Sequence, residues 1–107
     1  MATGALVIHP GALGDVLQAV PALRGLRAVG PITFVGQPRL GRLLVELGVA
    51  QRARAFDGFG LEALFVDGPA PATLAGALGD FDRIVSWFGS RDELYRRRLL
   101  ALAPRAI

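Results

Sequence analysis

Short apolar runs alternate along this chain with segments in which apolar residues recur every three or four positions. Continuous apolar runs are typical of buried strands, and the wider spacing is typical of helices that pack through one face. The runs predict strands at 5–8, 32–35 and 83–87, with a weaker strand within 52–56, where the alternation is poor. The periodic segments predict a helix from about 15 to 26 and further helices at 38–47, 61–65, 71–78 and 91–103.

This order of elements predicts an α/β fold, in which a mostly parallel, Rossmann-like sheet is flanked by helices on both faces. The 107 residues contain no linker or repeat, so residues 1–107 are expected to form one domain. Pro21 should bend the first helix, and Pro104 should stop the last one. Because Arg105-Ala106-Ile107 looks like the start of a fifth strand, we expect a truncated domain with an exposed sheet edge.

The residue types that are missing exclude several chemistries. The chain has no cysteine and one histidine, which excludes disulfides and thiol nucleophiles and argues against a zinc site. It also has no lysine, which a P-loop, a Schiff-base enzyme and a phosphoacceptor receiver domain each need. The net charge of +3 does not indicate nucleic-acid binding. Since no apolar run approaches the roughly 18 residues of a membrane span and no signal peptide is evident, a cytoplasmic location is expected.

The first strand is followed by a turn that two glycines bracket. Gly11, Ala12, Leu13 and Gly14 form this turn, and Asp15 follows it at the start of the first helix. In parallel α/β sheets, ligands bind in the crevice beyond the carboxyl ends of the strands, where first-turn amides carry partial positive charge. We therefore expect a ligand at this turn. Asp15 has two interpretations: it caps the helix, or it is a general base that takes a proton from a substrate hydroxyl.

Two segments of the chain, in the same order, are similar to a known family. The first is Gly11-Ala12-Leu13-Gly14-Asp15-Val16-Leu17, followed by Pro21-Ala22-Leu23-Arg24 in the first helix. The second is Phe81-Asp82-Arg83-Ile84-Val85-Ser86-Trp87-Phe88-Gly89-Ser90. Both resemble glycosyltransferase family 9, the ADP-heptose:lipopolysaccharide heptosyltransferases. The resemblance implies the N-terminal, acceptor-side half of a GT-B fold, with a donor-binding C-terminal domain that lies outside this chain.

What the resemblance implies about function is specific. It implies transfer of a heptose from ADP-heptose to a lipopolysaccharide core or a related glycan, with inversion and with Asp15 as the general base. Gly89, Ser90 and Arg91 would line the acceptor cleft, and Trp87 or Phe88 would form an apolar wall against a sugar. The partners would be a glycan or glycolipid acceptor and the nucleotide sugar, with no metal and no further cofactor. The 107-residue chain alone is expected to be inactive.

Alternatives remain for several residues and for the function. His9 replaces the basic residue that is common in the family, and a structural hydrogen-bonding role is the simpler interpretation. Ser90 and Glu93 could form a capping box. Arg96–Arg98 is either a solvated helix surface or a contact with anionic glycan at the inner membrane. A non-catalytic Rossmann-like module that binds a nucleotide or a protein is the rival function. A dinucleotide enzyme is disfavoured because Gly-x-Gly-x-x-Gly spacing is absent and no acidic residue follows the second strand.

Overall fold

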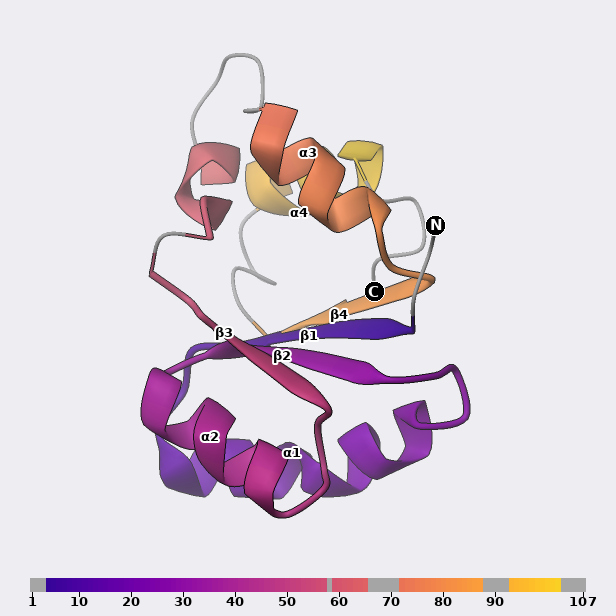
Figure 1. Cartoon of the computed structure of the whole chain (residues 1–107). Helices are drawn as coiled ribbons and strands as arrows, with labels where there is room; N and C mark the ends of the chain where they lie inside the picture. Colours follow the sequence, from indigo (N-terminus) through magenta and orange to yellow (C-terminus); the bar gives the residue numbers. More distant parts are fainter. Residues whose placement is uncertain (1–3, 58, 66–71, 88–92, 103–107) are drawn as a thin grey trace.

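The computed structural model describes residues 4–57, 59–65, 72–87 and 93–102, and within them the elements form three layers (Figure 1). Four parallel strands lie in the order β3-β2-β1-β4: β1 (Ala5–His9), β2 (Ile32–Gly36), β3 (Arg52–Ala55) and β4 (Arg83–Ser86). Helices α1 (Leu13–Leu26) and α2 (Pro38–Glu46) cover one face of the sheet, and η1 (Leu61–Phe65), α3 (Ala72–Gly79) and α4 (Glu93–Leu102) cover the other. The predicted Rossmann-like α/β class is confirmed.

The central strands β1 and β2 are mostly apolar because both of their faces are covered, and His9 and Thr33 are buried polar residues within them. Every residue of β1 and β2 is buried. Side chains alternate along each strand, so Val7 joins the core beneath α1 and α2, whereas Leu6 and Ile8 join the core on the other face. Continuous apolar runs without period-two alternation are expected for parallel strands buried in this way.

The exposure of the edge strand β3 explains why its sequence signal is weak. It forms at Arg52–Ala55 within the predicted 52–56, and all four of its residues are exposed. A strand with this exposure needs no apolar alternation. The helix before it ends through Gly48, whose φ of 73° allows the amide of Val49 to reach the carbonyl oxygen of Leu44 at 2.9 Å.

Most predicted boundaries agree with the structure to within one or two residues. Helix α1 runs without a break from Leu13 to Leu26 through Pro21. Strand β4 ends at Ser86, so Trp87 lies just beyond the strand instead of within it. The predicted helix ends at residues 71, 91 and 103 lie outside the described residues. Among the described residues, no helix has the length and apolar character that crossing a membrane requires.

The strand order creates a topological switch point between β1 and β4. From β1 the chain moves outward through β2 to β3, then crosses back over the sheet to place β4 on the other side of β1. The helices that follow β1 and β4 in the chain, α1 and α4, therefore lie on opposite faces of the sheet. Ligands in open α/β folds bind in the crevice that such an arrangement opens.

Candidate functional site

The turn between β1 and α1 positions Asp15 at the carboxyl edge of the sheet. Ala12 precedes the helix in an extended conformation, and the amide of Val16 closes the first turn by donating to the carbonyl oxygen of Ala12 at 3.0 Å. Asp15 is thus the third residue of α1, and its side chain is exposed.

The structure does not support the interpretation of Asp15 as a capping residue. The residue in the cap position is Ala12, whose methyl side chain accepts no hydrogen bond. Within the described part of the chain, no side-chain hydrogen bond to the Asp15 carboxylate is present. The carboxylate still lies in the first turn, where a negative charge interacts favourably with the helix dipole and stabilises the helix. Its oxygens are therefore available to a ligand.

The ring of His9, the last residue of β1, makes a hydrogen bond to the turn and an aromatic stack. The amide of Gly11 donates a hydrogen bond to Nδ1 of His9 at 3.1 Å, which requires that Nδ1 carries no proton. The imidazole also stacks on the indole of Trp87, with ring centroids 5.3 Å apart and planes inclined by 19°. Only 7% of His9 is exposed. The interpretation of His9 as a structural hydrogen-bonding residue is confirmed, and its stacking on Trp87 joins the ends of β1 and β4.

The two glycines of the turn have different surroundings. A Cβ at Gly11 would lie 2.6 Å from Cε1 of His9 and 3.2 Å from Cβ of Asp15, so a side chain there would displace one of them. A Cβ at Gly14 would have no atom within 4 Å. Gly11 is therefore needed for the packing of the turn, whereas the structure gives no packing reason for Gly14.

A cleft of about 410 Å³ opens beside this turn, at the switch point between β1 and β4. Its polar side chains come from Asp15 and Gln18 on successive turns of α1, and its aromatic ones are His9 and Trp87. Ala19 and Ala22 complete the lining and leave room because they are small. The cleft thus combines a carboxylate, an amide and an aromatic wall, which can hold a polyhydroxylated ligand and accept a proton from it.

The electrostatics of the cleft favour a neutral imidazole. Burial lowers the pKa of His9 from its ordinary value of 6.5, and the negative charge of Asp15 and a backbone hydrogen bond with Asp15 act in the opposite direction. A neutral His9 keeps Nδ1 as an acceptor for the Gly11 amide. Within the described residues, no three His, Asp or Glu side chains are grouped so that they could hold a metal ion.

Gln37 supports the turn from the neighbouring strand and was not predicted as part of the site. Its side-chain amide donates to the carbonyl oxygens of Pro10 at 3.3 Å and Gly11 at 3.1 Å. Gln37 follows β2, which pairs with β1, so the two strand ends are adjacent. The position of Gln37 directly after an apolar run is the sequence signal that could have indicated it. Gln18 was missed too, although it lies three residues after Asp15 on the same side of a helix.

Of the second segment singled out from the sequence, only part can be placed. Trp87 lines the cleft. Phe88, Gly89, Ser90 and Arg91 lie outside the described residues, and so does the capping box that includes Ser90.

The three arginines at 96–98 do not form one uniform surface. Arg96 is exposed and pairs with Glu93 at 3.5 Å, and Arg97 is exposed. Arg98 is partly buried, and its Nη1 donates to the carbonyl oxygen of Ala63 at 2.9 Å, which ties α4 to η1. The interpretation of the whole cluster as a solvated surface is therefore wrong for Arg98.

Comparison with protein-family models, with curated proteins and with solved structures found no match.

Proposed function

We propose that this chain is the acceptor-side domain of an inverting glycosyltransferase, which transfers a heptose from ADP-heptose to a lipopolysaccharide core or a related glycan. The observation that carries the proposal is Asp15, an exposed carboxylate that makes no capping bond and lines a cleft at the topological switch point. The resemblance of the 11–17 segment to glycosyltransferase family 9 is the basis for the proposed donor and reaction type.

In the proposed reaction, a hydroxyl of the acceptor glycan lies against Asp15. The carboxylate takes the hydroxyl proton while the hydroxyl oxygen forms a bond to the anomeric carbon of the heptose, from the face opposite the leaving group. The bond between that carbon and the diphosphate breaks, and ADP leaves with the electron pair. A general base of this kind contributes about 10²–10⁴-fold to a rate. The products are the extended glycan, ADP and a proton bound to Asp15.

The walls of the cleft suit a sugar acceptor. The exposed face of Trp87 can pack against the C–H groups of a pyranose ring, and the stack with His9 holds the indole in place. Gln18 offers both a donor and an acceptor to sugar hydroxyls. Gly14 leaves open space beside Asp15, which allows the acceptor to approach the helix start closely.

The proposal includes a second domain that binds the nucleotide sugar and closes over the cleft, which would keep water away from the activated heptose. The test therefore uses the full-length gene product. It is incubated with ADP-heptose and a delipidated lipopolysaccharide core, and the acceptor is weighed by mass spectrometry. A mass gain of one heptose is expected, and it should require both substrates. ADP-glucose and ADP-mannose serve as matched donors. No gain with any of the three nucleotide sugars would contradict the proposal.

A further inference from the structure

A second and larger hollow lies along the edge of the sheet, away from the cleft. It has a volume of about 650 Å³ and follows β3, which has β2 as its strand neighbour on one side and no strand on the other among the described residues. Gln51 precedes β3 and Phe81 precedes β4, so the groove reaches the end of the sheet where the strands begin. The cleft with Asp15 lies where they end. The two sites are therefore separate.

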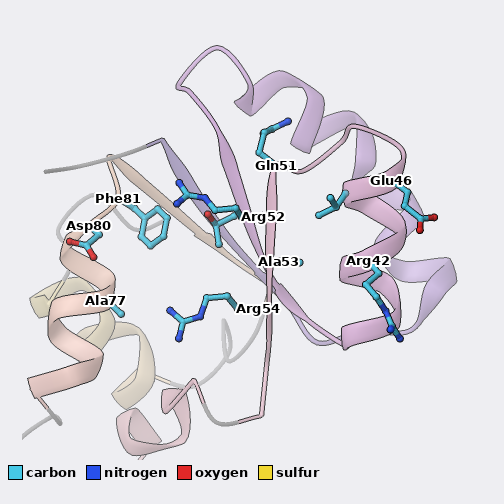
Figure 2. A pocket seen from close by; sticks show the side chains of 11 residues that line it. Arg42, Glu46, Gln51, Arg52, Ala53, Arg54, Ala77, Asp80 and Phe81 are labelled. Carbon is cyan, nitrogen blue, oxygen red and sulfur yellow. The ribbon is translucent and has the colours of Figure 1, made fainter.

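The two sides of β3 carry different chemistry. Arg52 is in register with Thr33 and Arg54 with Val35, so both arginines project from the face covered by η1, α3 and α4. Ala53 projects from the other face, where a Cβ on Gly41 of α2 would come within 2.8 Å of its own Cβ. Figure 2 shows the two arginines on one side of the strand, facing Ala77 and Phe81.

The arginines dominate the charge beside the strand. The guanidinium of Arg54 lies 5.0 Å from the centre of the Phe59 ring, which limits its freedom. Arg42 adds a third positive charge across the strand, while Glu46 and Asp80 lie at the two sides of the groove (Figure 2). A strand that pairs with β3 would therefore lie directly beside the positive charges of Arg52 and Arg54.

The outer edge of β3 also presents backbone N–H and C=O groups to a further strand. The amide of Phe56 donates to the carbonyl oxygen of Gly36 on β2 at 2.8 Å. Because alternate residues of a strand direct their backbone groups to the same side, Arg52 and Arg54 use theirs toward β2. Ala53 and Ala55 direct their N–H and C=O groups away from the sheet. Such an edge can pair with one more strand.

A second copy of this chain is a poor occupant of this edge. Two-fold pairing of β3 with itself places residues of the same face opposite each other, and the two registers that overlap most of the strand centre on Ala53 and on Arg54. The first register sets Arg52 against Arg54, and the second sets Arg54 against Arg54. Like charges directly opposite each other destabilise a strand pair. The Arg-Ala-Arg-Ala sequence thus disfavours self-pairing and favours a strand with carboxylates at alternate positions.

We propose that β3 is a docking edge for an extended segment of a partner protein that carries acidic residues at every second position. The segment adds a strand to the sheet, hydrogen-bonds to Ala53 and Ala55, and sets its carboxylates against Arg52 and Arg54. This inference does not rest on the proposed glycosyl transfer.

The test measures peptide binding to the 107-residue chain by fluorescence anisotropy. The probe is a fluorescein-labelled peptide of sequence Ser-Glu-Val-Glu-Val-Glu-Ser. One control has the same composition with the three glutamates adjacent, and another replaces each glutamate by lysine. The alternating acidic peptide should bind at least about tenfold more tightly than either control. In the lysine peptide the two cross-strand charge pairs become repulsive, and in the peptide with adjacent glutamates the alternating pairs are lost. Its affinity should also fall as salt is added.

Substitutions in β3 test whether the peptide binds at this edge. Arg52→Glu combined with Arg54→Glu should lose the acidic peptide and gain the lysine peptide, whereas Arg97→Glu on α4 should change neither. Ala53→Pro should abolish binding while circular dichroism shows a folded chain, because proline is tolerated where an edge N–H points away from the sheet. Equal binding of the three peptides, no binding at 1 mM peptide, or unchanged preference after the double charge reversal would overturn the proposal. So would a wild-type dimer that Ala53→Pro dissociates.

Discussion

Replacing Gly11 by alanine tests how the turn before Asp15 is held together. The new methyl carbon would lie 2.6 Å from Cε1 and 3.0 Å from Nδ1 of His9, closer than packed atoms allow. The imidazole cannot simply move aside, because only 7% of His9 is exposed and the ring stacks on the indole of Trp87. We expect the ring to rotate out of place, which breaks both its hydrogen bond to the Gly11 amide and its stack on Trp87.

The cost can be worked from these two contacts. A hydrogen bond contributes about 0.5–1.5 kcal/mol to stability, and a stacked aromatic pair contributes about 0.5–1.5 kcal/mol. Gly11→Ala should therefore lower the free energy of unfolding by about 1–3 kcal/mol, which for a chain of this length lowers the melting temperature by about 5–15 °C. Thermal unfolding followed by circular dichroism measures both quantities.

A double-mutant cycle separates the clash from a general backbone effect. In a His9→Ala background the ring is gone, so Gly11→Ala should cost less than half of what it costs in the wild-type chain. If Gly11→Ala leaves the melting temperature unchanged, or costs the same with and without the imidazole, then the packing of His9 on this turn is not what requires glycine.

Three further outcomes are expected. Gly14→Ala should raise the free energy of unfolding by about 0.5–1 kcal/mol, because alanine favours a helix and a Cβ at this position meets no other atom. In the full-length protein the same change should weaken acceptor binding. Unchanged binding would contradict the proposal that the acceptor approaches the helix closely beside Asp15. His9 should titrate below 6.5 by NMR. Between the two pKa values His9 binds a proton in the unfolded chain and stays neutral in the folded chain, so the free energy of unfolding should fall as the pH drops from 6.5 toward the pKa of folded His9. Urea unfolding measured against pH should show this loss in the wild type and not in His9→Asn. An equal loss in both proteins would refute the reasoning. Gly48→Ala should lower stability by about 1 kcal/mol in urea unfolding, because its φ of 73° is unfavourable for a residue with a Cβ while no neighbour is touched; a neutral result would contradict the role of Gly48 in ending α2.

The sheet could be predicted because burial on both faces leaves a strong apolar signal. The runs that became β1 and β2 are apolar at nearly every position, and these strands are fully buried. Strand β3 gave a weak signal for the opposite reason, since an exposed edge strand tolerates arginine and alanine in alternation. The parallel pairing was expected from the alternation of strands and helices, whereas the order β3-β2-β1-β4 was not predicted.

The candidate site was predictable only as far as it depends on strand ends. Gly11, Asp15 and Trp87 each lie directly after or near the end of a predicted strand, and parallel strands end at one edge of the sheet. The contacts of Gln37 with the turn and of Arg98 with η1 depend on how separate elements are packed together. Local patterns carry no information about such contacts. The capping interpretation of Asp15 failed because the helix begins two residues earlier, at Leu13.

The most direct test of the account compares wild-type protein with Asp15→Asn in the heptose-transfer assay, at full length and over a range of acceptor concentrations. Asparagine keeps the shape of the exposed side chain and cannot take a proton, so folding and the KM for the acceptor should change little. The kcat should fall by about 10²–10⁴-fold. A matched Asp57→Asn variant, at an exposed position outside the cleft, should keep the wild-type rate. If Asp15→Asn retains the wild-type kcat, Asp15 is not the general base and the central claim is wrong.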